Sequence, residues 1–200
     1  MPIRHVVGLF IDPKTEWRRI HEKNYSLAAC IFGHTVILSL IPAVSGFIGT
    51  TQIGWQIGAG DPVRLTTTSA GTIAVLYYLA MVSAVIGVGV VIRWMGQTYG
   101  ASQPLSKCMV LATLTASPLF LIGIMQLYPV LWLNFVIGLV ALGYTVYIFY
   151  SGVPIMMQIS QERGFLFGSA VMAFGLVTLV AMLAVTILIW GAGFAPAFTR

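Results

Sequence analysis

Five long apolar runs dominate this chain and restrict it to folding in a lipid bilayer. Each is about 19 to 26 residues long and as α-helix would measure about 28 to 39 Å, against a hydrocarbon core of about 30 Å. None contains Asp, Glu or Lys, and Arg93 lies only at the end of a run. The sequence therefore predicts an all-α membrane protein, a five-span transmembrane helical bundle. The runs are Leu27–Ile48, Thr72–Met95, Met109–Leu127, Val130–Tyr150 and Phe165–Trp190.

Composition excludes a water-soluble domain. Apolar residues make up 58% of the chain and charged residues 8%, whereas soluble domains carry about 25% charged residues. The net charge of +5 could indicate nucleic-acid binding, but the basic residues cluster beside the spans and form no basic face interleaved with aromatic residues. We therefore expect the lipid bilayer as partner, with other membrane proteins or lipids, and no nucleic acid.

The basic residues fall on alternate connections between the runs. Eight of the ten Lys and Arg residues precede the first run or lie in the second and fourth connections, which leaves Arg64 and Arg200 for the other side. By the positive-inside rule the N-terminus is cytoplasmic and the C-terminus lies outside. We thus expect a cytoplasmic interfacial segment over 1–26, five spans over 27–190 and an outer tail over 191–200. The eight are Arg4, Lys14, Arg18, Arg19, Lys23, Arg93, Lys107 and Arg163.

A short helix is predicted before the first span, with Asp12 as N-cap and Pro13 at the first helical position. Trp17 and Ile20 share one face and basic residues occupy the rest, a pattern typical of an interfacial helix among the headgroups of an anionic leaflet. The alternative is that this surface docks a partner protein. The candidate interaction surface consists of Trp17, Arg18, Arg19, Tyr147 and Tyr150.

The first outer connection, residues 49–69, is the longest. Apolar residues alternate with glycines in it, which favours a compact cap on the outer face of the bundle, with Trp55 at the interface and a turn at Asp61-Pro62. A loop of this length is often functional. A sealing cap and a functional loop remain alternatives.

Few polar residues lie within the runs. His34 is the only ionisable group well inside one, and such a residue is a functional candidate by default. The alternative is structural, since a neutral histidine can bond a hydroxyl or amide on a neighbouring helix. Pro118 predicts a kink in the third span, and broken helices also mark transporter sites. The candidate functional residues in the bundle are His34, Gln126 and Asn134.

Metal-dependent and hydrolytic chemistry find little support in this sequence. Cys30 lies one turn before His34, and Cys108 begins the third run, but a tetrahedral metal site needs three or four ligands. We expect free thiols, no metal and no cofactor. The runs lack paired carboxylates and the G-x-S-x-G and H-E-x-x-H motifs, so we expect that the protein is not an enzyme.

Three stretches resemble bacterial members of the Yip1 domain superfamily. They are the D-P-x-x-x-W pattern of residues 12–17, S-P-L-F-L-I-G at 117–123 followed by L-Y-P, and Y-x-x-Y-x-x-Y-S-G-V-P at 144–154; the loop stretch 47–55 adds to them. The resemblance covers nearly the whole chain and implies a five-span bundle with a cytoplasmic N-terminus in the bacterial inner membrane. Eukaryotic members are associated with vesicle trafficking and Rab-type GTPases, a role that we do not carry over. The family supplies no catalytic residues.

Two functions are compatible with these observations. The first is a non-enzymatic membrane scaffold or membrane-organising protein that acts through the cytoplasmic face of the Trp17 helix and residues 151–164. The second is a small transporter or lipid-handling protein with a polar path near His34, Gln126 and Pro118. The second predicts a water-accessible cavity bordered by His34 and Gln126.

Overall fold

The computed structural model describes residues 4–55 and 61–199. It contains five helices long and apolar enough to cross a membrane, which confirms the predicted five-span all-α bundle. Most of the helices extend past the apolar runs into polar flanks, because backbone hydrogen bonding continues where the hydrocarbon ends. The five spans are Leu27–Ile53, Thr67–Thr98, Leu105–Leu127, Leu131–Met157 and Gln161–Gly193.

Three of the spans are long continuous helices and two are interrupted. The continuous ones are α6 (Thr67–Thr98), α9 (Leu131–Met157) and α10 (Gln161–Ile189), and the last ends in the π-helical turn η4 (Trp190–Phe194). The first span comprises α3 (Leu27–Cys30), π-helical η1 (Ile31–Thr35), α4 (Val36–Leu38), α5 (Leu40–Ile48) and π-helical η2 (Gly49–Ile53). The third comprises α7 (Leu105–Thr115), α8 (Ser117–Ile122) and 3₁₀-helical η3 (Gly123–Leu127). Two short helices precede them, α1 (Arg4–Ile11) and α2 (Pro13–His21).

The break in the third span lies where the sequence predicts a kink. α7 ends at Thr115 and α8 begins at Ser117, with Pro118 in its first turn. The Ser117 hydroxyl donates to the carbonyl of Thr113 at 3.5 Å, so a side chain takes up a carbonyl near the break. Such local rebonding is what allows a proline inside a membrane helix.

The third span is the centre of the bundle. Of its most apolar window, 67% is buried inside the protein, against 0% for the fifth span. Leu111, Leu114 and Thr113 of α7 are fully buried. The outward faces of the other spans carry exposed Leu, Val, Ile and Phe side chains, as expected of helices whose surroundings are lipid.

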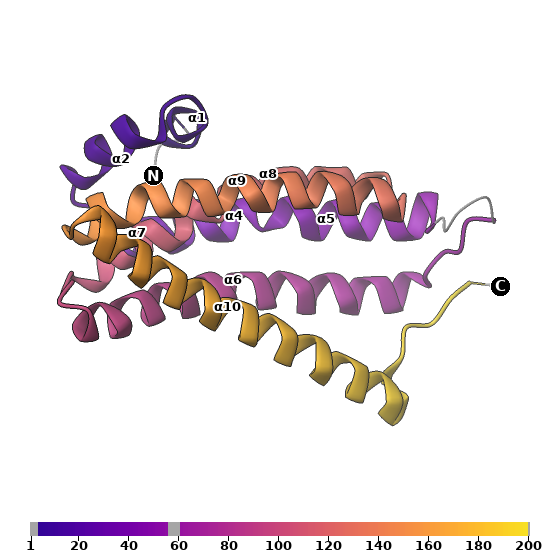
Figure 1. Ribbon diagram of the computed structural model, residues 1–200. Coiled ribbons are helices and arrows are strands. Elements are labelled where there is room, and N and C mark those ends of the chain that lie inside the picture. The colour runs from indigo at the N-terminus through magenta and orange to yellow at the C-terminus, as the bar shows by residue number, and fades with distance from the viewer. Residues whose placement is uncertain (1–3, 56–60, 200) are drawn as a thin grey trace.

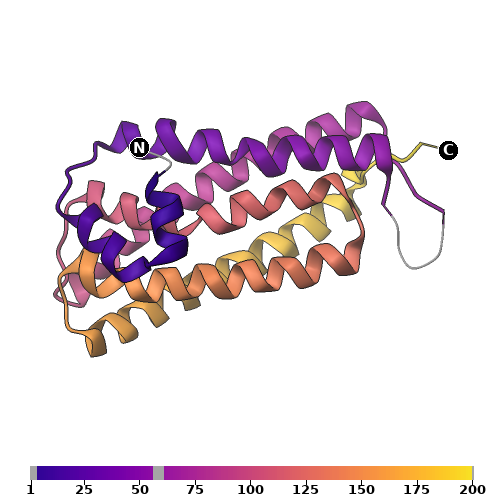
Figure 2. The ribbon, with the colours of Figure 1, turned by 90° about the horizontal axis from the view of Figure 1, so that it is seen from above.

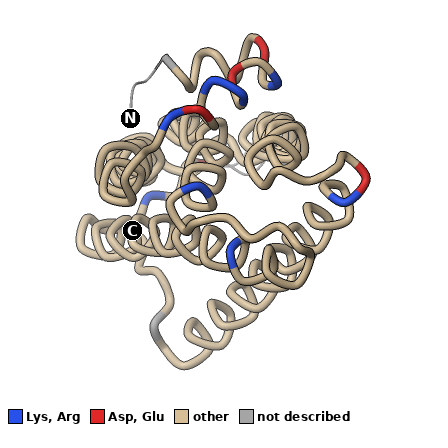
Figure 3. The backbone as a smooth tube through the Cα atoms, turned by 90° about the vertical axis from the view of Figure 1, so that its left-hand side faces the viewer, with Lys and Arg blue, Asp and Glu red and all other residues tan. Residues whose placement is uncertain are grey.

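The bundle has two unlike ends (Figure 1). One, here called the basic end, carries α1, α2 and the connections after α6 and α9, and Figure 3 shows that the Lys and Arg residues gather there. At the other, the outer-loop end, Arg64 is the basic residue that the structure describes. Figure 2 shows α1 and α2 lying against one side of the bundle at the basic end.

At the outer-loop end the first long loop is folded and is joined to the C-terminal tail. Trp55 pairs antiparallel with Val63, and Leu65 with Phe198. The amide of Thr66 donates to the carbonyl of Ala197 at 3.0 Å. The predicted cap therefore exists as far as the described residues show it; positions 56–60, which precede the expected turn at Asp61-Pro62, lie outside them. The tail adds to the cap, which the sequence did not predict.

α10 packs against the bundle at the basic end and diverges from it toward the outer-loop end (Figure 1). Gly164 and Gly168 bring it close to α9, where an added Cβ would lie 2.9 Å from Pro154 and 3.0 Å from the Tyr150 ring, respectively. Close approach at small residues is the usual way in which membrane helices pack. The G-x-x-x-G spacing of these two glycines places both on the same face at the start of the fifth span.

Candidate functional site

The α2 helix begins as the sequence predicts. The Asp12 side chain accepts a hydrogen bond from the Thr15 amide at 3.2 Å, and Pro13 occupies the first helical position. Hydrogen bonds from the side chain and backbone of Thr15 lower the pKa of the Asp12 carboxyl. The cap therefore keeps its negative charge at neutral pH, next to the positive end of the helix dipole.

Trp17 lies inside the protein, which corrects its assignment to the exposed interaction surface. Its side chain is fully buried, and its indole Nε1 donates to the carbonyl of Ile148 in α9 at 3.1 Å. A Cβ on Gly152 would lie 2.5 Å from the indole, so this glycine provides the space for the ring. The apolar face of α2 packs on protein rather than lipid because α9 offers space at Gly152 and a hydrogen-bond acceptor at Ile148.

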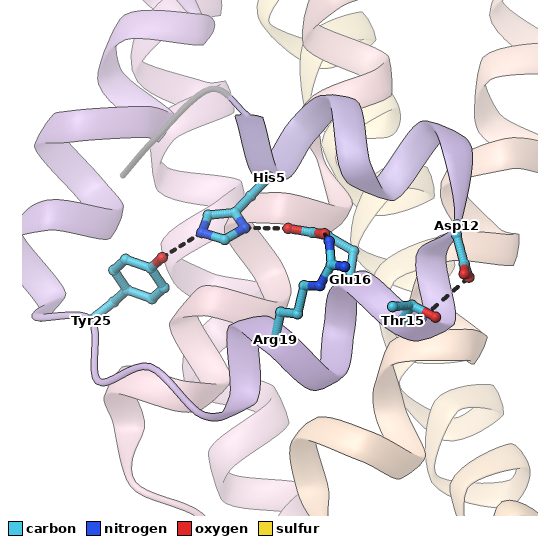
Figure 4. Close-up of polar contacts among 6 residues, drawn as sticks. All are labelled: His5, Asp12, Thr15, Glu16, Arg19 and Tyr25. Atoms are coloured by element: carbon cyan, nitrogen blue, oxygen red, sulfur yellow. Dashed lines mark hydrogen bonds and ion pairs between the residues drawn. The ribbon is translucent and has the colours of Figure 1, made fainter.

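A buried polar cluster joins α1 to α2 and was not predicted (Figure 4). His5 Nδ1 contacts the Glu16 carboxylate, and His5 Nε2 lies 2.6 Å from the Tyr25 hydroxyl. Arg19 reaches the other carboxylate oxygen of Glu16 at 3.4 Å. Gly8 makes room for it, since a Cβ there would lie 2.5 Å from the Glu16 side chain. The sequence feature that could have indicated this cluster is the three-residue spacing of His5 and Gly8, which places both on one face of an apolar helix.

Three of the predicted surface residues meet in one hollow. Arg18, Tyr147 and Tyr150 line a groove of about 500 Å³ between α2, α9 and the start of α10, together with Lys14. Arg19 points instead toward Glu16. Two cations beside two tyrosines can bind an anion. This hollow is called the basic groove, and its lining residues are Lys14, Arg18, Tyr147, Tyr150, Ser151, Pro154, Ile155, Ile159, Gln161 and Phe165.

His34 lies in a packed contact between the first and third spans. It is buried, and its Nε2 lies 2.9 Å from the Ser117 hydroxyl. One turn of π-helix, η1, places it there, and the neighbouring Thr35 hydroxyl donates to Thr113 Oγ1 at 3.2 Å. Cys30 and Cys108 are buried free thiols. Within the described residues no group of three or more His, Cys, Asp and Glu side chains is placed to hold a metal ion.

Gln126 lines two cavities at the outer-loop end, of about 650 and about 710 Å³. Its amide donates to the Tyr77 hydroxyl at 3.2 Å. Asn134 lines the first cavity, but its amide donates to the carbonyls of Tyr128 and Val130 and so caps the turn before α9. His34 borders neither cavity, so the structure does not bring the three candidate polar residues together. Both cavities are lined by Gly46, Thr50, Trp55, Tyr77 and Gln126.

Comparison with known proteins places these features in a family. The model of the Yip1 domain matches residues 7–182. The chain is 40% identical over 190 residues to the protein named inner membrane protein YohC from Escherichia coli strain K12, covering 95% of this chain and 97% of that protein. The chain belongs to the Yip1 domain family. The protein of the same name from Escherichia coli O6:H1, strain CFT073, matches with the same identity and coverage. No solved structure matches.

The Yip1 domain match includes the whole basic groove and stops before the tail. The parts of the second cavity contributed by Trp190, Pro196 and Phe198 therefore lie beyond it. Five apolar spans and the two inner-membrane relatives make this Yip1 domain chain a multi-pass inner membrane protein.

Proposed function

We propose that this Yip1 domain protein is a non-enzymatic membrane-organising scaffold that acts through its basic end on the cytoplasmic side. The observation that carries the proposal is the attachment of α1 and α2 to the bundle. A helix held to a span by a buried indole presents its outer face in a fixed position, which is the property that a scaffold needs.

The predicted topology supports the cytoplasmic placement of this face. The N-terminal segment and the second and fourth connections carry the basic residues at one end of the bundle (Figure 3). With five spans, the C-terminus then lies on the periplasmic side. Reporter fusions at the two termini would test this orientation.

The absence of enzymatic activity is part of the same proposal. His34 is engaged with Ser117 inside a packed contact, at a distance of 2.9 Å. Its Nε2 therefore serves helix packing. Turnover of any lipid or peptide bond by the purified protein, lost on His34→Ala, would contradict this part.

Site-specific photo-cross-linking in native membranes tests the scaffold. Cross-linkers replacing Arg19 on α2 and Lys23 in the turn after it, both exposed, should capture discrete protein partners. The charge-reversed pair Arg19→Glu and Lys23→Glu should abolish capture from a third position, Glu22. Arg64→Glu at the other end is the control and should leave capture unchanged. Recovery of no discrete partner from any of the three positions would refute the scaffold.

A second candidate function is lipid handling at the outer-loop end, which the two cavities that share Gln126 favour. Their lining is mostly apolar with a few polar groups, as in sites for amphipathic ligands. Gln126, Tyr77 and Thr50 line both cavities, Asn134 lines the first and Asp61 the second. Gly138 lines the first cavity and has open space beyond its Cα, so Gly138→Trp should fill it. If the protein moves lipid, this change should slow lipid exchange in reconstituted vesicles, while Gly175→Trp on α10 should not. Equal rates in all three proteins would exclude this function.

A further inference from the structure

The side of the bundle that carries α1 lies at the depth of the lipid leaflet. The Tyr144 hydroxyl donates to the carbonyls of Leu9 and Phe10 at 3.1 and 3.0 Å, and the Phe10 ring stacks on Tyr144 at 5.2 Å. Tyr144 lies 13 residues before the end of α9 at Met157, or about 20 Å along the helix. The end of α1 is therefore held beside the apolar part of α9.

The outward face of α1 agrees with this depth. Val7, Phe10 and Ile11 are exposed, and Ile11 is 79% exposed. Exposed apolar residues gathered on one short helix indicate contact with lipid. The basic groove follows directly along the chain, since Asp12 caps α2 and Lys14 lies in its first turn. The groove thus lies where headgroups meet acyl chains.

The groove has two cations that form no salt bridge within the described residues. Lys14 and Arg18 lie one turn apart on α2, and within the described residues neither takes part in an ion pair. The two carboxylates nearest along the chain are engaged elsewhere: Asp12 accepts from the Thr15 amide, and Glu16 contacts His5 and Arg19. Tyr147 is half exposed at the rim. These groups are suited to phosphate oxygens, which accept strong hydrogen bonds from charged donors.

An apolar groove continues from the basic one. It has a volume of about 700 Å³ and lies between α8 and α9 beneath Phe10. Its lining includes Pro118, Val140 and Gly143, and Tyr147 lines both grooves. A polar hollow that passes into an apolar one at the same leaflet depth has the shape and polarity of a phospholipid: a charged head followed by a hydrocarbon chain.

We propose that the two grooves together bind one anionic phospholipid of the leaflet, with its phosphate between Lys14 and Arg18 and an acyl chain along Pro118 and Val140. The exposed apolar residues beside the groove favour a lipid over a soluble phosphate or an acidic peptide. The inference deepens the proposed function and rests on it in one respect: the basic end must face the leaflet that holds anionic lipid.

Native mass spectrometry of the purified full chain tests the headgroup site. Dioleoylphosphatidylglycerol is the probe, and dioleoylphosphatidylcholine is the neutral comparison. The double variant Lys14→Ala and Arg18→Ala should bind the anionic lipid about 10- to 30-fold more weakly, since each basic residue near an anionic surface contributes about 1 kcal/mol. Arg19→Ala with Lys23→Ala removes the same charge from α2 and the turn after it. Neither side chain lines the groove, so this pair should change binding less than about twofold, since exposed charges at a distance are screened. Equal losses in both double variants would overturn the site.

A second variant tests the acyl chain and distinguishes a lipid from free phosphate. An added Cβ at Gly143 meets nothing within 4 Å, and Gly143 lines the apolar groove, so Gly143→Trp should fill this groove and keep the fold. It should weaken phosphatidylglycerol binding and leave the affinity for inorganic phosphate unchanged. Gly175→Trp on α10 is the matched control. Unchanged lipid binding in Gly143→Trp, or inorganic phosphate competing at the same concentration as the lipid, would overturn the proposal.

The two proposals fail in different ways. Loss of selective lipid binding with cross-linked partners retained at Arg19 and Lys23 would remove the lipid site and leave the scaffold. Selective lipid binding without protein partners would remove the scaffold and leave the lipid site.

Discussion

The basic end and the outer-loop end of this bundle are closed in different ways. At the basic end, side chains form polar bonds between elements: Trp17 with the Ile148 carbonyl, and Tyr150 with Ser169 at 2.9 Å. Along the outer half of α10 the hydroxyls of Thr178 and Thr186 bond carbonyls of α10 itself, and the polar bond between spans at that end joins Gln126 to Tyr77. α10 lies close to α9 where bonds between elements occur, and it diverges from α9 where its hydroxyls bond only its own carbonyls.

This difference shows what determines helix separation in a membrane. Apolar side chains gain little by exchanging lipid for another apolar helix, so small residues and interhelical hydrogen bonds decide where helices touch. The basic end has both, in Gly152 beneath Trp17 and Gly168 beneath Tyr150. The outer half of α10 lacks them among the described contacts, and its Leu179 lines the first of the cavities beside Gln126.

The largest expected effect comes from removing the tie between α2 and α9. Trp17→Ala should destabilise the purified protein by about 3 to 5 kcal/mol, as for other buried aromatic residues, and release α1 and α2. Unfolding in mixed detergent micelles measures it. Trp94, which is 63% exposed, is the matched control, and Trp94→Ala should cost less than about 0.5 kcal/mol. Similar losses in both variants would mean that α2 does not brace the basic end.

A glycine substitution tests whether the outer-loop end also has a tight contact. A Cβ on Gly49 would meet the backbone carbonyl oxygen of Gln126, and backbone cannot move aside as a side chain can. Gly49→Ala should therefore destabilise by about 1 to 3 kcal/mol. Gly138→Ala faces open space in the first cavity and should be nearly neutral. A neutral Gly49→Ala would mean that the contact between η2 and η3 is loose enough to accept a methyl group, so that the outer-loop end has no tight contact at this point.

The contact between His34 and Ser117 should contribute a smaller amount. Interhelical hydrogen bonds in membranes average about 0.6 kcal/mol and reach about 1.7. A double-mutant cycle with His34→Ala and Ser117→Ala should give a coupling energy in that range. A coupling near zero, with loss of a solute flux in His34→Ala alone, would return His34 to the polar path that the sequence suggested.

The smallest expected effect is a pH dependence at the basic end. Burial, and then the positive charge of Lys107, lower the pKa of His21 below its usual 6.5. The folded state therefore binds fewer protons than the unfolded one below pH 6.5, and stability should fall as pH drops through that value toward the lowered pKa. Melting temperatures from pH 7.5 to 5.5 would show this. In His21→Gln the melting temperature should change less with pH. An unchanged dependence on pH would mean that other groups cause it.

Much of the fold was predictable because hydropathy and charge act locally. The five runs, the Asp12 cap and the break beside Pro118 each depend on residues within a turn or two of one another. The candidate site was predicted less well. Arg18, Tyr147 and Tyr150 do share a groove, but Lys14 was not singled out, and the partnership of His5 with Glu16 depends on the angle between two helices that no local pattern encodes.

The sequence by itself determined that this protein lives in lipid, how often it can cross, and at which end its positive charge collects, since all three follow from the cost of placing polar groups in hydrocarbon. Only the tertiary structure decided which apolar surfaces face protein and which face lipid. Ile11 and Ile20 have identical hydropathy, yet Ile11 is exposed whereas Ile20, like Trp17, is buried. Lipid is as apolar as a helix surface, so burial is decided by shape and by polar partners such as the Ile148 carbonyl.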